Sequence, residues 1–427
     1  MTREPNLIDK LTLNIGLPNL EELIEVADEL GMPLYLVGGP VRDLRLNRTS
    51  VDADVAVEGD AATVAVEFAA RVGGEVVRHP AFLTATVKSD YWVLDLTTTR
   101  SEEYPGPGAL PRVRPASIEK DLLRRDFTIN AMAIRLNGPM TGELIDPAGG
   151  VRDLKNGVIR VLHEDSFKDD PTRILRATRY ETRFRYIIEP DTFGWLVSDV
   201  GCLATVSGVR LRHEIERILA EAEPDLTLRR LDRLGGLAAI DSDLSFDEQK
   251  MRAFSAHLGS RTEITALWPL LFWDLSDVQI NRLSQRLALT KRQSQDTAAV
   301  PQIRAIEKQL ASRETRRSQV AEMLDPFPTA TIWALIAATR RETVKHRCLD
   351  YLLNARSVRP RLRGDDLIAL GVPRGAELGQ ILHRLRSARL DHEVTSREDE
   401  ERFVRRLAAR GDEADEHAKQ TASSRSS

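Results

Sequence analysis

The sequence predicts an α+β protein in which an N-terminal head with a small β-sheet precedes an elongated all-helical remainder. Candidate strands concentrate in the first third of the 427-residue chain. After about residue 160, Leu-, Ala-, Arg- and Glu-rich segments with helical spacing continue to about residue 410. Hydrophobic residues make up 42% of the chain, enough for packed cores in several structural units.

The first elements alternate between helix and strand patterns. Residues 20–30 have helical apolar spacing, and Asn19 is the expected N-cap, with a glutamate three positions later. Residues 34–37 form a short strand candidate that stops at Gly38, Gly39 and Pro40. Because proline suits the first turn of a helix, a further helix is expected directly after these glycines.

The rest of the head continues this alternation. Residues 52–57 alternate polar and apolar side chains, which is typical of a half-buried strand. Four prolines and two glycines within 104–116 predict a loop, and a helix is expected over 119–135. The intervening pattern predicts one helix and three strands, over 61–71, 75–77, 84–88 and 91–96.

Composition excludes several classes of protein. The chain has 61 Lys and Arg against 65 Asp and Glu, a net charge of −4, and only two cysteines. Two cysteines provide neither a disulfide framework nor a Cys-rich zinc site, which fits a reducing compartment such as the cytoplasm. The N-terminus lacks the apolar core of a signal peptide, and no run of 18 uncharged apolar residues occurs. We therefore expect no membrane association.

Carboxylates on the predicted strands form a candidate metal site. Asp52 and Asp54 are two residues apart, so both project from the same face of a strand. Two close carboxylates repel each other unless a cation lies between them. Two Mg²⁺ ions about 3.5–4 Å apart perform in-line phosphoryl displacement in many enzymes. Asp95 lies in a nearby apolar strand, where an unpaired carboxylate is costly. Taken alone, however, the Asp-x-Asp pattern usually marks a solvated strand face or turn.

A glycine pair precedes these carboxylates. Gly38 and Gly39 between a strand and a helix leave backbone N–H groups free and let a phosphate approach closely. Arg42 on the first helical turn could reach the same phosphate. The segment lacks the Lys-Ser/Thr of a Walker loop and the third glycine of a dinucleotide fingerprint. A tight turn without a ligand is the alternative interpretation.

Four sequence blocks together resemble the class II tRNA nucleotidyltransferase and bacterial poly(A) polymerase family. Their order and spacing agree with the family over roughly residues 33–220, and a weaker similarity covers residues 363–375. The Asp121–Ala133 block resembles the family's Arg-Arg-Asp-Phe-Thr-x-Asn-Ala motif. The other three blocks are Val37–Asp43 with Asp52-Ala-Asp54, Asp146–Leu154, and Asp169–Arg179.

The resemblance implies an enzyme with a head, a neck, a body and a tail. Such an enzyme adds CMP or AMP to RNA 3′ ends, using CTP and ATP with Mg²⁺ and no nucleic-acid template. The expected parts are a catalytic nucleotidyltransferase head over 1–160, a base-selecting neck over 161–225, an RNA-binding body and tail over 226–410, and a disordered end over 411–427.

The resemblance also assigns roles to single positions. Two carboxylates would ligate magnesium, Asp52 and Asp54, and a third catalytic carboxylate, Asp95, would help to activate the primer 3′-hydroxyl. The remaining matched residues would bind the incoming nucleotide through its phosphates or its base: Gly38, Gly39, Arg42, Arg125, Asp170, Arg173, Arg176 and Arg179.

The last of these blocks has a physical logic of its own. Arg173, Arg176 and Arg179 recur every three residues and would line one slowly rotating helix face. Asp170 supplies an acceptor and Arg173 a fork of donors, which could accept both cytosine and adenine and leave groups of guanine or uracil unmatched. The alternative is a solvated arginine face paired with Asp169 and Glu181.

Three departures from the family pattern stand out. Asp169 replaces the usual glutamate, so a hydrogen bond that orients Arg173 is expected to be looser. Val209 replaces an acid in the later stretch Ser207–Glu214, which affects expected neck contacts. No His-Asp dipeptide occurs, so the appended phosphohydrolase domain of some relatives is not expected.

The most specific prediction is a tRNA nucleotidyltransferase that builds or repairs the 3′ CCA end. Residues 281–347 hold 13 Lys and Arg against 6 Asp and Glu, a local excess that fits binding of an RNA backbone by shape and phosphate. A solvated helix face is the alternative for this segment. Alternatives for the whole chain are a CC-adding enzyme, an A-adding enzyme, a poly(A) polymerase and a non-catalytic RNA-binding relative. The oligomeric state stays open.

Overall fold

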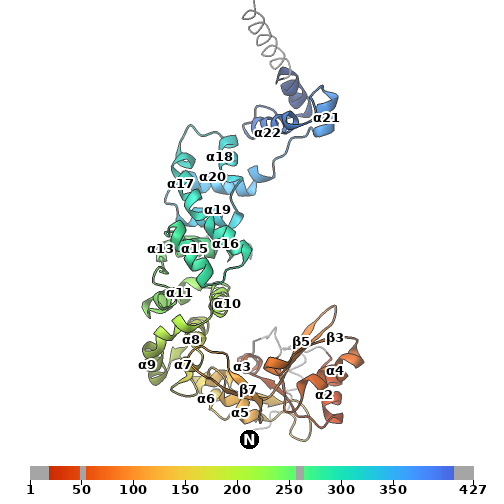
Figure 1. The fold of residues 1–427 in the computed structure, drawn as a ribbon, viewed down its shortest axis with the longest axis vertical. Coiled ribbons are helices and arrows are strands. Elements are labelled where there is room, and N and C mark those ends of the chain that lie inside the picture. Colours follow the sequence, from red (N-terminus) through yellow and green to blue (C-terminus); the bar gives the residue numbers. More distant parts are fainter. Residues whose placement is uncertain (1–18, 49–53, 256–263, 408–427) are drawn as a thin grey trace, which may run out of the picture. The chain divides into compact units, whose positions relative to one another are not determined.

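A computed structural model describes residues 19–48, 54–255 and 264–407. The chain forms two compact units (Figure 1). The first runs to Phe246 and includes Arg286–Ala288, and the second comprises Asp247–Gln285 and the chain from Leu289 onward. A mixed sheet followed by many helices confirms the predicted α+β class. In the described part of the chain, no helix is long and apolar enough to cross a bilayer.

One seven-stranded sheet organises the head. Its strand order is β3-β4-β5-β2-β1-β8-β9. All neighbours are antiparallel except β2 and β5, which run parallel and pair Asp54 with Asp95. The strands are β1 Leu34–Val37, β2 Asp54–Val57, β3 Glu75–His79, β4 Thr84–Lys88, β5 Val93–Thr98, β8 Ala133–Arg135 and β9 Leu144–Ile145.

Helices cover both faces of this sheet. Helix α4, Ala61–Val72, packs on β3, β4 and β5, and α2, Leu20–Glu29, packs on α4 (Figure 1). The other face carries α5, Ile118–Leu123, in a core cluster that includes Tyr35, Val37 and Ala56. Because side chains alternate along a strand, Asp54 projects to the same face as Ala56. The carboxylate of Asp54 therefore lies on the α5 side of the sheet.

Most predicted head elements are confirmed. The helices over 20–30 and 61–71 and the strands over 34–37 and 84–88 occur within one residue or so of the expected bounds. Asn19 is the N-cap, but its backbone is left-handed, with φ 52°, and its side chain makes no capping hydrogen bond. The strand expected over 52–57 is described from Asp54, and its first two residues lie outside the described ranges.

The helix expected over 119–135 is wrong beyond Leu123. Residues Thr128–Asn130 form a 3₁₀ turn, η2, and the following residues form β8, which pairs with β1. The Asp126 side chain accepts hydrogen bonds from the Phe127 backbone N–H and the Asn130 side chain, which holds the chain in a turn. The buried edge of β1 then makes strand pairing more favourable than a continued helix.

The loop expected over 104–116 is partly wrong. Its last part is strand β7, Arg112–Pro115, which pairs with β6, Arg100–Glu103, in a two-stranded ribbon. Pro115 pairs with Arg100 at the end of the ribbon, where the missing proline N–H disrupts no further ladder. The prolines therefore led to the prediction of a loop where the chain forms a strand of a separate two-stranded sheet.

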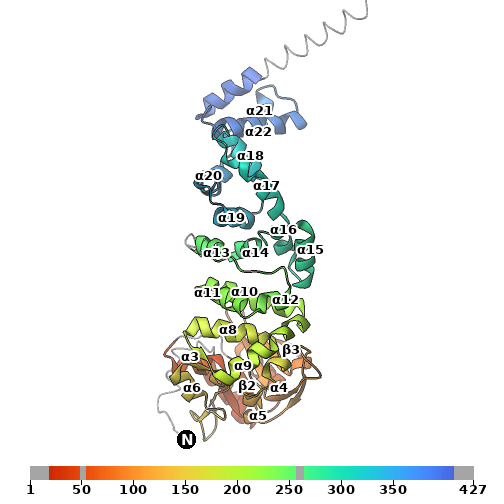
Figure 2. The ribbon, with the colours of Figure 1, turned by 90° about the vertical axis from the view of Figure 1, so that its left-hand side faces the viewer.

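Further helices complete the first unit. Helix α8 packs against α10 and α11 (Figure 2), and two-residue strands β10, Val158–Ile159, and β11, Ile187–Ile188, pair in parallel. These helices are α3 Gly39–Arg45, α6 Gly150–Asn156, α7 Ser166–Asp169, α8 Thr172–Phe184, α9 Pro190–Asp199, η3 Val200–Thr205, α10 Gly208–Leu219, α11 Pro224–Arg233 and α12 Gly236–Ile240.

The second unit is built around an apolar helix. Helix α19, Thr329–Ala338, is almost wholly buried and packs against several neighbouring helices. A second, smaller core joins α21, Gly364–Ala369, to α22, Ala376–Leu390. The helices around α19 are α13 Glu248–Ser255, α14 Leu267–Leu271, α16 Lys291–Ala298, α17 Val300–Ala311 and α20 Glu342–Leu353. The remaining α-helices of the unit are α15 Asp277–Arg286 and α18 Arg317–Leu324.

Several cations of the basic segment 281–347 have structural partners within the second unit. Arg347 donates to the backbone carbonyls of Leu310, Ser312 and Thr315, at the end of α17. Arg317 makes a two-point ion pair with Asp350. Part of the local positive excess therefore stabilises helix ends and helix contacts.

A glycine contact tests the packing of the head. A Cβ at Gly150, on α6, would overlap the Thr128 carbonyl oxygen and lie 2.9 Å from Met132 Cγ. Because both neighbours are buried, Gly150→Ala should destabilise the protein by about 1–3 kcal/mol. Gly194, inside α9, has no atom within 4 Å of such a Cβ. Gly194→Ala should be neutral or stabilising by up to ~1 kcal/mol. Thermal unfolding of both variants measures this, and equal effects would contradict the described packing.

Candidate nucleotide-binding site

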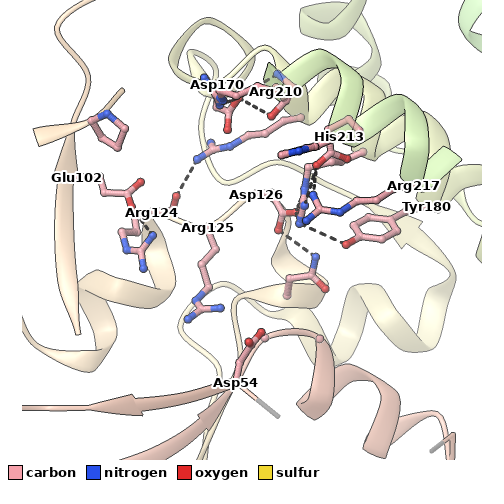
Figure 3. A pocket seen from close by; sticks show the side chains of 18 of the residues that line it. Asp54, Glu102, Arg124, Arg125, Asp126, Asp170, Tyr180, Arg210, His213 and Arg217 are labelled. Carbon is pink, nitrogen blue, oxygen red and sulfur yellow. Dashed lines mark hydrogen bonds and ion pairs between the residues drawn. The ribbon is translucent and has the colours of Figure 1, made fainter. Parts of the chain in front are cut away.

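A cavity of about 530 Å³ lies in the first unit (Figure 3). Its walls come from the β1–α3 turn, β2, the β6–β7 ribbon, α5 with the following turn, α8 and α10. The size suits a small-molecule ligand. Eight arginines outnumber five carboxylates on its wall, so the cavity favours a polyanion. These arginines are Arg42, Arg100, Arg124, Arg125, Arg173, Arg176, Arg210 and Arg217.

The glycine pair, Gly38 and Gly39, lines the cavity. Gly38 has φ +73°, a backbone conformation that favours glycine, and a Cβ there would lie 2.7 Å from Arg125 Nη1. Gly39 begins α3 directly after it. The absence of side chains at this turn therefore lets the backbone and the Arg125 guanidinium share one corner of the cavity.

Arg42 lines the cavity but is only 4% exposed. Its Nε and Nη2 donate to Asp43, and Nη1 donates to Asn130 Oδ1 at 2.7 Å. The guanidinium also lies 4.8 Å from the ring centroid of Phe184. These contacts hold the cation in one orientation before any ligand binds.

The predicted carboxylates are only partly described. Asp54 lines the cavity, and Asp95 is its register partner on the neighbouring strand. Asp95 accepts a hydrogen bond from Thr86 Oγ1 at 2.6 Å and does not belong to the cavity wall that the described residues form. Asp52 lies outside the described residues. Within the described ranges, no cluster of three or more candidate ligands surrounds a metal position.

The donor chemistry of this strand pair nevertheless fits a divalent cation. Asp54 and Asp95 project from adjacent parallel strands to one face, and carboxylate oxygens are the ligands that Mg²⁺ prefers.

A buried carboxylate on α5, Asp121, holds the two consecutive arginines that follow this helix, Arg124 and Arg125. It is 1% exposed and accepts from the Arg100 backbone N–H, from Arg124 Nη2 at 2.7 Å and from Arg125 Nη2 at 2.9 Å. Burial alone would raise the pKa of Asp121, but the Arg125 and Arg124 guanidinium groups outweigh it and lower the pKa. Arg124 also reaches Glu102, whereas Arg125 points toward Asp54 (Figure 3).

A second buried carboxylate, Asp126, holds Arg176. Arg176 donates to Asp126 Oδ2 through Nε at 2.8 Å and Nη2 at 2.5 Å. Burial would raise the pKa of Asp126, but the Arg176 charge and the hydrogen bond from Asn130 outweigh it and lower the pKa to about 2. Arg176 is therefore oriented along the cavity wall by a charge that the fold itself supplies.

Asp170 and Arg173 lie together on the cavity wall, as the sequence predicts. Asp170 Oδ1 accepts from Thr172 and from Arg210. Arg173 is held by Ser166 Oγ at 2.5 Å and by the Arg124 carbonyl oxygen at 2.8 Å. These partners orient Arg173 without the glutamate that the family pattern carries.

The position next to Asp170 has a different partner. Asp169 lies 3.7 Å from His163 Nε2. Burial raises the pKa of Asp169 and lowers the pKa of His163. The shorter acid therefore lies beside a histidine, and neither residue belongs to the cavity wall that the described residues form.

Arg179 does not line the cavity that the described residues form. Its Nη1 donates to Glu221 Oε1 at 3.1 Å. Side chains three residues apart on a helix differ in direction by about 60° around the helix axis. From Arg173 through Arg176 to Arg179, the side chains therefore turn progressively away from the cavity. Because Arg173 and Arg179 are only 4% and 6% exposed, the alternative of a solvated arginine face is wrong.

The sequence did not predict the cavity residues on α10 or on the β6–β7 segment. Four polar residues of α10 follow helical spacing and face the cavity, and that spacing could have revealed them. The ribbon residues Glu102 and Tyr104 had no such pattern, although Tyr104 donates to Glu102 at 2.7 Å. The four residues on α10 are Arg210, His213, Glu214 and Arg217.

Comparison with known proteins agrees with this geometry. Residues 34–160 match the poly(A) polymerase head domain. An A-adding tRNA nucleotidyltransferase of Geobacter sulfurreducens is 36% identical over 410 residues, 91% of this chain and 47% of that protein. The chain spans about half the length of the first curated relatives it matches.

Two solved structures match over almost the whole chain. An apo CCA-adding enzyme has a TM-score of 0.77 at 31% identity, covering 96% of this chain and 100% of that one. The Thermotoga maritima CCA-adding enzyme complexed with tRNA has a TM-score of 0.74 at 30% identity, with the same coverage.

The head sheet, the paired carboxylates and the arginine-lined cavity define a nucleotidyltransferase fold. The chain belongs to the tRNA nucleotidyltransferase and poly(A) polymerase family.

The Asp126–Arg176 pair makes a pH-dependent contribution to stability. An unfolded aspartate has a pKa of about 3.9, so lowering the pKa to about 2 corresponds to roughly 2–3 kcal/mol of stability. This stability is fully present above pH 4 and is lost as the pH falls through 2. Asp126→Asn should therefore destabilise the protein strongly at pH 6 and progressively less toward pH 2. Urea unfolding across this range measures the difference, and a pH-independent difference would contradict the lowered pKa.

Proposed function

We propose that the protein adds nucleotides to the 3′ end of tRNA and builds or repairs the CCA sequence. The substrates are CTP and ATP, and no nucleic-acid template takes part. The observation that carries this proposal is one cavity lined by a carboxylate and a guanidinium from neighbouring positions, Asp170 and Arg173, and by a strand carboxylate, Asp54.

The base would be selected by protein groups. Cytosine and adenine both present an exocyclic amine beside a ring acceptor. The Asp170 carboxylate accepts from the amine, and Arg173 donates to the ring nitrogen. Uracil and guanine place a carbonyl where the amine would be, so a buried acceptor would face another acceptor. The contacts of Arg173 with Ser166 and the Arg124 carbonyl preorganise this edge.

The phosphates would lie among the cavity arginines. Arg42 and Arg125 lie beside the glycine turn, and Arg176 lines the same cavity. Two of these cations are already paired with Asp43 and Asp126, so they are oriented without a ligand. The arginines of the cavity outnumber its carboxylates, so some positive charge has no partner within the wall. The negative charge of a triphosphate would compensate it.

The transfer step requires the RNA 3′-hydroxyl to attack the α-phosphorus while pyrophosphate leaves. Asp52 and Asp54 would hold Mg²⁺. Bound Mg²⁺ lowers the cost of charge on the attacking and leaving oxygens. Asp95, held by Thr86, would lie beside them and assist in removing the hydroxyl proton. Arg125, pointing toward Asp54, would hold the phosphate chain in line (Figure 3).

Addition of the terminal A alone is a second candidate. It is favoured by the relative named as an A-adding enzyme, which aligns over 91% of this chain. The same cavity and the same transfer step serve both activities, so the two candidates differ only in which nucleotides are accepted and when synthesis stops. The helical second unit would bind tRNA by shape and phosphate through the cations of residues 281–347 that lie on its surface.

One assay tests the reaction and separates the candidates. Full-length protein is incubated with tRNA that ends at the discriminator base or after CC, with CTP alone, ATP alone or both, and the product lengths are measured. CCA addition extends the first substrate by three nucleotides only when both triphosphates are present. A-addition extends only the second substrate, by one nucleotide. No extension of either substrate would contradict the proposed function.

Matched variants test the carboxylates in the same assay. Asp52→Ala and Asp54→Ala should each lower kcat/KM by about a thousandfold, since stabilisation of charge by a held metal is worth several kcal/mol. Glu67→Ala removes an exposed acid from α4, away from the cavity, and should leave the rate unchanged. Activity retained by Asp54→Ala would exclude the assigned role.

A further inference from the structure

Arg210 of α10 reaches two separate parts of the cavity wall with its two terminal nitrogens. Nη2 donates to Asp170 Oδ1 at 2.6 Å, as Figure 3 shows, and Nη1 donates to the Gly108 carbonyl oxygen at 3.1 Å. The side chains of Arg210 and Asp170 are 26% and 21% exposed, so the pair lies largely out of solvent. A single guanidinium therefore connects the base-reading carboxylate to the β6–β7 segment.

The Asp170 carboxylate is held through one oxygen only. Oδ1 also accepts from the Thr172 backbone N–H at 3.0 Å and from Thr172 Oγ1 at 2.6 Å. Thus three donors from two helices converge on Oδ1, and among the described residues none donates to Oδ2. Donors from different directions fix the rotation of the carboxylate plane. Oδ2 is then the acceptor that remains for a ligand in the cavity.

The second acceptor of Arg210 is itself held in place. Gly108 has φ +71°, and a Cβ at this position would overlap Thr205 Oγ1. Its backbone N–H donates to the Lys168 carbonyl oxygen at 3.3 Å. The Gly108 carbonyl is therefore a fixed point, and two fixed acceptors set the plane of the Arg210 fork.

We propose that Arg210 is a positioning residue for base selection, which fixes Asp170 so that Oδ2 faces the base. The proposal rests on the proposed function, because it names what orients the base-reading acceptor. Without Arg210, the Thr172 contacts remain but the carboxylate can rotate about them. Its acceptor is then no longer held against the exocyclic amine of cytosine or adenine, and the distinction from uracil and guanine weakens.

Arginine is required at this position rather than any cation. A lysine ammonium could neutralise Asp170 but is a single point, and it cannot span both the carboxylate and the Gly108 carbonyl in a fixed plane. Arg210→Lys should therefore restore only part of the selectivity that Arg210→Gln removes. Gly108→Ala should act in the same direction as Arg210→Gln, because it displaces the second acceptor and leaves Asp170 and Thr172 untouched.

The test compares base preference with overall function. Dissociation constants of CTP, ATP and UTP are measured by calorimetry on the full chain without RNA, and kcat/KM is measured for each nucleotide with tRNA. Arg210→Gln should reduce the preference for CTP over UTP by about tenfold, the effect of one charge-assisted hydrogen bond. The matched control is Arg230→Gln on α11, outside the cavity. It removes a two-point ion pair with Glu181 of α8 and should leave the preference unchanged.

Each outcome decides the proposal. It is overturned if Arg210→Gln weakens all nucleotides by the same factor, or if Arg230→Gln changes the preference equally. If Arg210→Gln does not fold, Arg210→Lys and Gly108→Ala decide by the same ratio. Wild-type protein that binds CTP in preference to UTP but transfers neither would remove the proposed function alone, and the variants would still test Arg210 through binding.

Discussion

The site depends on the burial of negative charge beside arginine side chains. Asp121 and Asp126 are buried carboxylates on either side of the consecutive Arg124 and Arg125. A buried carboxylate is costly unless cations and hydrogen bonds compensate it, so each must hold its arginines in a defined geometry. Asp121 separates Arg124 from Arg125, directing one to Glu102 and leaving the other toward the strand carboxylate. The arrangement of cations on the wall follows from this constraint.

Under the proposed function, a site built in this way would select a base without a template. Contacts within one folded unit fix its donors and acceptors. The donor and acceptor atoms that remain available to a ligand then determine which ligand binds. The Arg173 guanidinium donates to the backbone carbonyl of Arg124, next to Arg125. The proposed base-reading edge and the proposed phosphate-binding corner would therefore share one support. A preorganised polar edge of this kind rejects a mismatched base because the mismatch leaves a buried polar group unpaired.

Much of this could be predicted from local sequence, and the rest required tertiary structure. The Gly38 turn follows from spacing and residue type, whereas the family resemblance singled out the Asp170–Arg173 pair, and both line the cavity. The break at Asp126 could not be predicted, because it results from strand pairing between β8 and β1, far apart in sequence. The direction of Arg179 depends on Glu221, a partner on another helix, and the role of Arg210 depends on two acceptors in other segments. Residue spacing identifies the helix face on which a side chain lies, whereas the tertiary partners of that side chain determine its direction and role.

The central claim is that a single cavity, made only of protein groups, receives both substrates in turn. Competition binding tests it most directly. Labelled CTP is bound to the full-length protein without RNA and displaced by each unlabelled triphosphate. Our account predicts one CTP per chain, complete displacement by ATP at comparable concentration, and much weaker displacement by UTP and GTP. Simultaneous binding of CTP and ATP, or equal displacement by all four triphosphates, would contradict it.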